Sequence, residues 1–215
     1  MDIQNKNRKL LKKNHVYDET MEHDACGVGL VASTEGLKSR KVVEYGIEAL
    51  KAVWHRGAID ADGKTGDGAG IHIEIPNDFF AEKIEITGHE HDNSDLCVGM
   101  IFLPRNDFGG QEQCRSIVES ELTKKNFNIY GWRQVPVDPS VLGEKAEQTR
   151  PEITQVLFTH NDKSIHGKDL ERALYETRRK IEKEALRNQL NNFYICSFSS
   201  KSIIYKGMFL AESLS

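Results

Sequence analysis

The residues of this sequence whose side chains have the most distinctive chemistry are its four cysteines. Cys26 lies in EHDACGVGLVAS (residues 22–33), between a polar, charged segment and an apolar run. Cys97 and Cys196 lie in apolar segments, and Cys114 lies on the apolar side of a helix-like repeat. Cysteine is among the most often buried residue types, so we expect these three to be core residues. The four are far apart and form no CxxC pair, which argues against a disulfide framework or a zinc ribbon.

Cys26 differs from the other three because of the bond that precedes it. If the chain is cut between Ala25 and Cys26, the thiol gains a free α-amine as its neighbour, and the unperturbed pKa values of the two groups, about 8.5 and about 7.7–8.0, lie close together. One residue then supplies both a nucleophile and its base. While residues 1–25 remain attached, that nitrogen is an amide without a basic lone pair, so the precursor should be inactive. We therefore predict that residues 1–25 are a leader removed on maturation. The alternative is a solvated tail in front of a buried thiol.

A glycine-rich stretch, GKTGDGAG, is a second candidate for a site. A dinucleotide fingerprint needs a strand before the glycines and a helix after them, but here a strand follows, and the Gly-Lys-Ser/Thr of a P-loop is missing. Gly66, Gly68 and Gly70 therefore favour a tight turn with a close backbone approach. Asp67, between the glycines, is placed to line a site.

The densest group of potential metal ligands is His89, Glu90, His91 and Asp92. Its spacing is that of a polar loop, without the i, i+4 pair of histidines that a helical zinc site uses. We therefore predict no metal site.

The composition of the 215 residues is that of a folded domain, because 38% are hydrophobic and 29% charged. The formal charge of −4 gives no reason to expect a nucleic-acid partner, and no apolar run approaches the roughly 18 residues of a membrane span. The basic residues near the N-terminus flank only the pair Leu10 and Leu11, so the segment lacks the apolar region of a secretory signal. A reducing, cytoplasmic setting is expected.

Hydrophobic periodicity predicts the elements that must position these residues. Residues 27–32 read as a short buried strand. In residues 39–57, apolar side chains recur at i, i+4, i+7 and i+11, which predicts a helix that Gly57 ends. Residues 192–200 and 201–209 predict an antiparallel hairpin, and the closely spaced strands favour an α+β fold over a parallel sheet. Further strands are predicted at 71–75, 96–104, 128–138 and 152–160, a loop or short helix at 140–148, and helices after Gly110 and from 168 to 188.

Four blocks of the sequence carry a resemblance to a known family. They are HDACGVGLVA at Cys26, WHRGAIDADGKTGDGAGI at 54–71, VGMIFLP at 98–104 and FYICSFSSKSIIYKGM at 193–208. Together they resemble the N-terminal part of glutamate synthase large chains, which begin with a class II glutamine amidotransferase domain of the N-terminal-nucleophile type. The resemblance implies a four-layer α/β/β/α sandwich with two antiparallel sheets. Residues 26–215 would form the N-terminal part of that domain, incomplete at its C-terminus.

By the same resemblance, Cys26 is the mature N-terminus and attacks the side-chain amide of glutamine, giving a glutamyl thioester and ammonia. Arg56 and Gly57 match the family's Arg-Gly pair, which helps to hold the cysteine; from the residues alone they fit the end of a helix equally well. Asp67 and Gly68 match the family's glycine-rich turn. They are expected to contact the residues that bind the substrate rather than the substrate itself.

The resemblance also implies features of a longer chain. The ammonia would pass to a synthase region with FMN and an iron-sulfur cluster, which aminates 2-oxoglutarate and takes electrons from a small subunit or ferredoxin. None of these cofactors is expected within residues 1–215. No segment after Met208 matches the family's Arg-Phe-Ser-Thr glutamine-binding segment or its Asn-Gly oxyanion pair. One oxyanion donor is worth about 2.7–4 kcal/mol of barrier, so a chain truncated here should be a very weak glutaminase.

Two alternatives remain at this point. One is a different class II amidotransferase with another acceptor, although in those enzymes the cysteine usually follows the initiator methionine directly or after a short leader. The other is a catalytically inactive interaction module that retains its leader.

Overall fold

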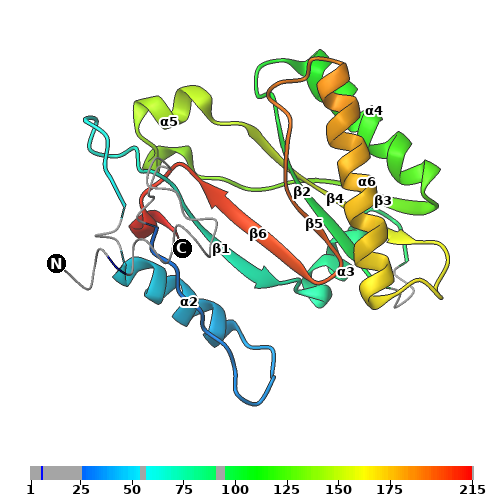
Figure 1. The fold of residues 1–215 in the computed structure, drawn as a ribbon, viewed down its shortest axis with the longest axis horizontal. Coiled ribbons are helices and arrows are strands. Elements are labelled where there is room, and N and C mark those ends of the chain that lie inside the picture. Colours follow the sequence, from blue (N-terminus) through cyan, green and yellow to red (C-terminus); the bar gives the residue numbers. More distant parts are fainter. Residues whose placement is uncertain (1–5, 7–25, 54–56, 91–94, 215) are drawn as a thin grey trace.

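The computed structural model of the chain describes residues 6, 26–53, 57–90 and 95–214. The helices and strands in this part of the chain carry the labels of Figure 1. In chain order they are α2 (Arg40–Ala52), β1 (Ala69–Glu74), α3 (Asn77–Ile86), β2 (Cys97–Leu103), α4 (Phe108–Lys124), β3 (Phe127–Gln134), the 3-10 helix η2 (Pro139–Val141), α5 (Glu144–Thr149), β4 (Glu152–His160), α6 (Gly167–Arg187), β5 (Tyr194–Ser199), β6 (Ser202–Gly207) and the 3-10 helix η3 (Ala211–Ser213).

The elements stack in four layers (Figure 1). Helices α4 and α6 cover one face of a four-stranded sheet with the order β3-β4-β2-β5, in which all pairs are antiparallel. A second, two-stranded antiparallel sheet pairs β1 with β6. Helix α2 packs on β1 and forms the fourth layer. The predicted α+β fold with two antiparallel sheets is therefore confirmed.

Two apolar cores separate these layers, because strand side chains alternate between the two faces of a sheet. On β4, Val156 and Phe158 lie in the core beneath α4 and α6, and Leu157 lies in the core between the sheets. Helix α6 was predicted from hydrophobic periodicity, and the apolar stripe that indicates it is fully buried against the first core. Its members are Leu170, Leu174, Thr177 and Ile181.

The strand predicted at residues 27–32 is wrong. The structure gives this segment no strand, and its side chains Val28 and Leu30 are 90% and 92% exposed. A strand needs a neighbour for its backbone hydrogen bonds. Within the described chain the two-stranded sheet consists of β1 and β6 alone, so the apolar run has no partner strand.

The hairpin predicted at residues 192–209 is also wrong. Both strands form, but β5 pairs with β2 in the larger sheet, whereas β6 pairs with β1. Glu171 on α6 holds the turn between them, because its carboxylate accepts hydrogen bonds from the hydroxyls of Ser199 and Ser200 and from the Ser200 N–H. The chain thus crosses from one sheet to the other at this turn.

Helices α2 and α3 depart from the prediction. Helix α2 ends at Ala52, where the N–H of Val53 donates back to the Leu50 carbonyl at 3.2 Å, rather than at Gly57. Helix α3 was not predicted. Its fully buried Phe80 and Ile84, four residues apart on one face, are the signal that indicates it.

Candidate active site

The four cysteine thiols occupy two kinds of environment. Cys26 is exposed, whereas Cys97, Cys114 and Cys196 are buried, as expected of core residues. Burial raises the pKa of Cys114 to about 11, and burial likewise raises the pKa values of Cys97 and Cys196. A thiol is nucleophilic only as its thiolate, so the three buried cysteines are chemically inert near neutral pH.

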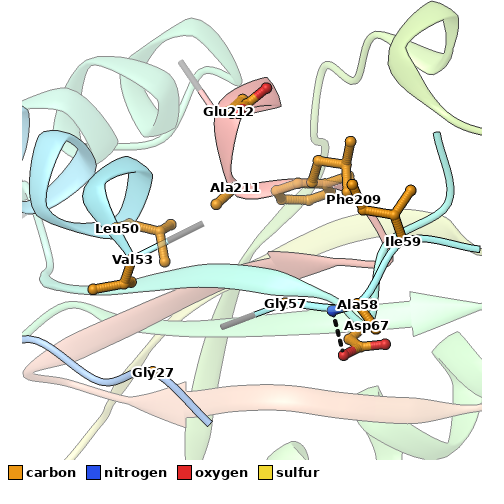
Figure 2. Close-up of a pocket in the computed structure, with 11 residues that line it drawn as sticks. Gly27, Leu50, Val53, Gly57, Ala58, Ile59, Asp67, Phe209, Ala211 and Glu212 are labelled. Atoms are coloured by element: carbon orange, nitrogen blue, oxygen red, sulfur yellow. Dashed lines mark hydrogen bonds between the residues drawn. The ribbon is translucent and has the colours of Figure 1, made fainter. Parts of the chain in front are cut away.

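A cavity of about 140 Å³ begins at the residue after Cys26. It is small beside the roughly 300–1,000 Å³ of pockets for drug-sized ligands, and its size suits an amino acid better than a nucleotide. Three distant parts of the sequence form its wall (Figure 2). The lining residues are Gly27, Leu50, Val53, Gly57, Ala58, Ile59, Asp67, Phe209, Leu210, Ala211 and Glu212.

One side of this wall is a short antiparallel ladder between residues 58–60 and 65–67. The N–H of Asp60 donates to the Thr65 carbonyl at 2.8 Å, and the N–H of Asp67 donates to the Ala58 carbonyl at 3.3 Å. Ile59 and Gly66 pair between them. The Asp67 carboxylate also accepts the N–H of Ala58 at 2.8 Å, drawn as the dashed line in Figure 2. Asp67 therefore fixes the backbone next to Gly57.

The glycines of this region permit a close approach to the end of β6, as the sequence predicted. A Cβ on Gly70 would lie 2.7 Å from the Tyr205 carbonyl oxygen, and one on Gly66 would lie 3.0 Å from the Phe209 carbonyl oxygen. Gly68 has φ +121°, a conformation that other residues rarely adopt. The glycines thus bring residues 66–70 against the segment that supplies the opposite wall.

The structure brings together several of the predicted site residues. Gly57 and Asp67 line the cavity, and Cys26 adjoins it through Gly27. Gly68 follows Asp67 and supports the turn without lining the cavity. Arg56 lies outside the described residues, as do 1–5 and 7–25 of the predicted leader.

Sequence reasoning missed the opposite wall, Phe209 to Glu212. The available signal was position alone, because this segment directly follows the block that ends at Met208. Leu50 was predicted on the apolar stripe of its helix, and the structure places it at the cavity as well.

The arrangement combines an exposed thiol with a small cavity whose lining is mostly apolar and includes the acidic residues Asp67 and Glu212. An exposed thiol is, by its chemistry, a candidate nucleophile for attack on a carbonyl carbon. Within residues 6, 26–53, 57–90 and 95–214, no group of three or more His, Cys, Asp or Glu side chains is placed to hold a metal ion; His91 and Asp92 lie outside these ranges. No helix of the described chain is long and apolar enough to cross a membrane.

Comparisons with known proteins agree with this geometry. Residues 26–215 match the family described as class-II glutamine amidotransferases. Over 208 residues, 97% of the chain, the sequence is 53% identical to the glutamate synthase [NADPH] large chain of Azospirillum brasilense. It is 38% identical over 188 residues to ferredoxin-dependent glutamate synthase 2 of Synechocystis, and 38% identical over 201 residues to ferredoxin-dependent glutamate synthase 1 of Arabidopsis thaliana, covering 87% and 92% of the chain.

The chain spans 12 to 14% of the length of these relatives. The family match, in contrast, begins at Cys26 and covers the rest of the chain. The layered fold of these residues is that of the N-terminal-nucleophile hydrolases. The chain therefore belongs to the class-II glutamine amidotransferases.

Proposed function

We propose that this chain is the glutaminase part of a glutamate synthase, and that Cys26 is its nucleophile after removal of residues 1–25. The observation that carries the proposal is the exposure of Cys26. Its thiol is exposed whereas the other three are buried, and the next residue, Gly27, lines a cavity of amino-acid size to which three distant segments contribute. The start of the family match at Cys26 supports the same boundary.

The proposed reaction needs only the cysteine, glutamine and water. The free α-amine of Cys26 accepts the thiol proton, and the thiolate attacks the side-chain amide carbon of glutamine to form a C–S bond. The tetrahedral intermediate collapses as the C–N bond breaks, and the leaving nitrogen takes the proton from the α-ammonium group and departs as ammonia. Water, deprotonated by the same amine, then attacks the thioester carbon, and glutamate leaves as the Cys26 thiol is restored.

The residues around the cavity take supporting parts in this proposal. Arg56 and Gly57 hold the N-terminal cysteine. Asp67 fixes the backbone that follows Gly57, because its carboxylate accepts a hydrogen bond from the Ala58 N–H. Gly68 allows the turn that presents Asp67 to the wall. Glu212 belongs to the opposite wall of the cavity.

The proposal assigns the ammonia to a synthase region that aminates 2-oxoglutarate. It is supported by the relatives being named glutamate synthases. Such a region would carry the FMN and the iron-sulfur cluster and would receive electrons from a small subunit or ferredoxin. The described residues do not fit an iron-sulfur cluster, because their buried cysteines are dispersed and no group of metal-binding side chains is present among them. By itself the 215-residue chain should hydrolyse glutamine very weakly, and we place the protein in the cytoplasm.

The intact mass of the protein, isolated from its own cells at its natural length, tests the maturation step. A chain that begins at Cys26 supports the proposal, whereas an active enzyme that retains residues 1–25 contradicts it. Labelling with a glutamine-like electrophile tests the nucleophile. Modification of Cys26 is expected, and modification of Cys97, Cys114 or Cys196 in its place would contradict the assignment. Glutaminase activity without glutamate formation from 2-oxoglutarate would point to a different acceptor.

A further inference from the structure

The ladder that lines the cavity has a far end, the turn at residues 60–65. Its near end carries Gly57, Ala58 and Asp67 of the cavity wall. Backbone hydrogen bonds join the two ends, since Asp60 pairs with Thr65 and Ala58 pairs with Asp67. A displacement of residues 60–65 therefore also displaces the cavity wall, because the ladder is short and its backbone hydrogen bonds connect the two ends directly.

The turn is organised by the carboxylate of Asp62. The hydroxyl of Thr65 donates to Asp62 Oδ2 at 2.5 Å, and the N–H groups of Thr65 and Lys64 donate to Oδ1 at 2.7 and 2.9 Å. The hydrogen bond from the Thr65 side chain is the main reason that the pKa of Asp62 is lowered to about 2, followed by the two from backbone N–H groups. Thr65 itself is only 3% exposed, although it lies in a loop.

The turn rests on the segment between η2 and α5. Gly143 is buried against it so closely that a Cβ at this position would overlap the side chains of Asp62 and Thr65 and lie 2.6 Å from the Thr65 backbone nitrogen. Lys145 adds an ion pair to Asp60 at 2.6 Å. The Lys145 side chain is 68% exposed, so this pair contributes little and the Gly143 contact is the main anchor. Figure 1 shows α5 beside the loop that follows α2.

We propose that Thr65, Asp62 and Gly143 are positioning residues for glutamine: they hold the ladder so that its cavity wall stays in register with Cys26. This inference rests on the proposed function. The connection between β3 and β4 contributes no residue to the cavity lining. The proposal gives this connection a part in substrate binding through Gly143.

The test compares Thr65→Val, which removes the hydroxyl at nearly constant volume, with Thr65→Ser, which keeps it, in the processed protein at its natural length. Gly143→Ala is the second variant. Gly109→Ala is its control, because a Cβ there makes only an ordinary 3.6 Å contact with Asp107. The readouts are KM and kcat for glutamine, and the labelling rate of each cysteine with a glutamine-like electrophile and with iodoacetamide.

We expect Thr65→Val and Gly143→Ala to raise KM and to slow labelling of Cys26 by the glutamine-like electrophile by about tenfold, since a small misplacement of a substrate contact has effects of this size or larger. Labelling of Cys26 by iodoacetamide should stay unchanged, and Thr65→Ser and Gly109→Ala should behave as the unmodified protein. Equal KM and labelling in Thr65→Val and Thr65→Ser would overturn the proposal.

The buried thiols separate this role from a general structural one. If iodoacetamide reaches Cys97, Cys114 and Cys196 in both Thr65→Val and Gly143→Ala, the residues support the whole fold and the proposal is overturned. A failure of the proposed function looks different, because the unmodified protein would then show no preference of the glutamine-like electrophile for Cys26.

Discussion

At the scale of single residues, the environment of each thiol decides its chemistry. The buried Cys114 sits in the core beneath α4 and α6, where desolvation disfavours the thiolate and raises its pKa to about 11. Cys26 is exposed, and the residue after it, Gly27, lines the cavity. The same side chain is thus a packing group in one place and a candidate nucleophile in another, and the difference lies in solvent access.

Replacement of Cys26 provides the most direct test at this scale. We expect Cys26→Ala, in the protein at its natural length, to lower kcat for glutamine hydrolysis by about 10³-fold or more, since loss of the nucleophile removes the covalent route. Cys114→Ala is the matched control and should retain kcat despite a loss of stability. A steady-state glutaminase assay measures both, and near-normal turnover by Cys26→Ala would exclude a covalent role.

At the scale of elements, close backbone approach and local ion pairs hold the segments around the site. Strand β1 can lie against β6 because glycine at position 70 leaves room for the backbone of Tyr205 and for Lys206. Helix α5 is held by Glu147, whose carboxylate binds Arg105 and Arg150. These contacts hold β1 and α5, the two elements that adjoin the ladder of residues 58–60 and 65–67.

Gly70→Ala tests the approach of the two strands. A Cβ at this position would lie 2.7 Å from the Tyr205 carbonyl oxygen and from Lys206 Cβ, so one strand must shift. We expect a loss of about 1–3 kcal/mol in the free energy of unfolding, the usual cost of overpacking. Urea denaturation measures it. Gly109→Ala, in the first turn of α4, should be neutral or slightly stabilising, and an equal loss in both variants would contradict this account.

The ion pairs of α5 predict a pH dependence of stability. Hydrogen bonds from Arg150 and then Arg105 lower the pKa of Glu147 to about 2. The unfolded chain has the ordinary value of about 4.3, so the contribution of Glu147 is complete above about pH 5 and is lost as the pH falls towards 2. We therefore expect Glu147→Gln to lower Tm at pH 6 and to flatten the fall of Tm between pH 5 and pH 2.

Glu144→Gln is the control for this experiment. Its carboxylate, on the same helix, accepts a hydrogen bond from the neutral side chain of Gln148. Its Tm curve should run parallel to that of the unmodified protein. A steeper acid dependence in Glu147→Gln than in Glu144→Gln would reject the assigned role.

At the scale of the whole molecule, the core between the sheets holds the layers in place. Phe80 of α3 and Ile203 of β6 meet there, and both are fully buried. The side-chain amide of Gln155 on β4 is buried in the same layer. Its N–H donates to the Tyr205 hydroxyl at 3.2 Å, and its oxygen accepts from Arg133 at 2.8 Å. This junction sets the position of β6, and β6 leads into the cavity wall.

Phe80→Ala tests the contribution of this core. Removal of a fully buried phenylalanine should lower the free energy of unfolding by about 3–5 kcal/mol. Phe108 is the matched control because it is 78% exposed, and Phe108→Ala should change the free energy of unfolding by less than about 0.5 kcal/mol. Chemical denaturation followed by far-UV circular dichroism measures both, and equal effects would show that α3 is not part of the core.

The success of sequence reasoning depended on how local each feature is. The stripe of α6, with Leu170, Leu174 and Ile181, repeats over several turns, and the structure buries all of it. Helix α3 was missed because only Phe80 and Ile84 mark its buried face. The hairpin was misplaced because alternation shows which face of a strand is buried without showing which strand lies beside it.

The sequence by itself set Cys26 apart, since it alone of the four cysteines lies between a polar, charged segment and an apolar run, and it determined the periodicity of the long elements. Only the tertiary structure decided that Gly27, Gly57, Asp67 and the segment after Met208 surround one cavity. The physical reason is that such contacts depend on the crossing of the chain from β5 to β6 and on the close approach that Gly66 and Gly70 permit. The strand pairs and contacts that result join residues about ninety or more positions apart.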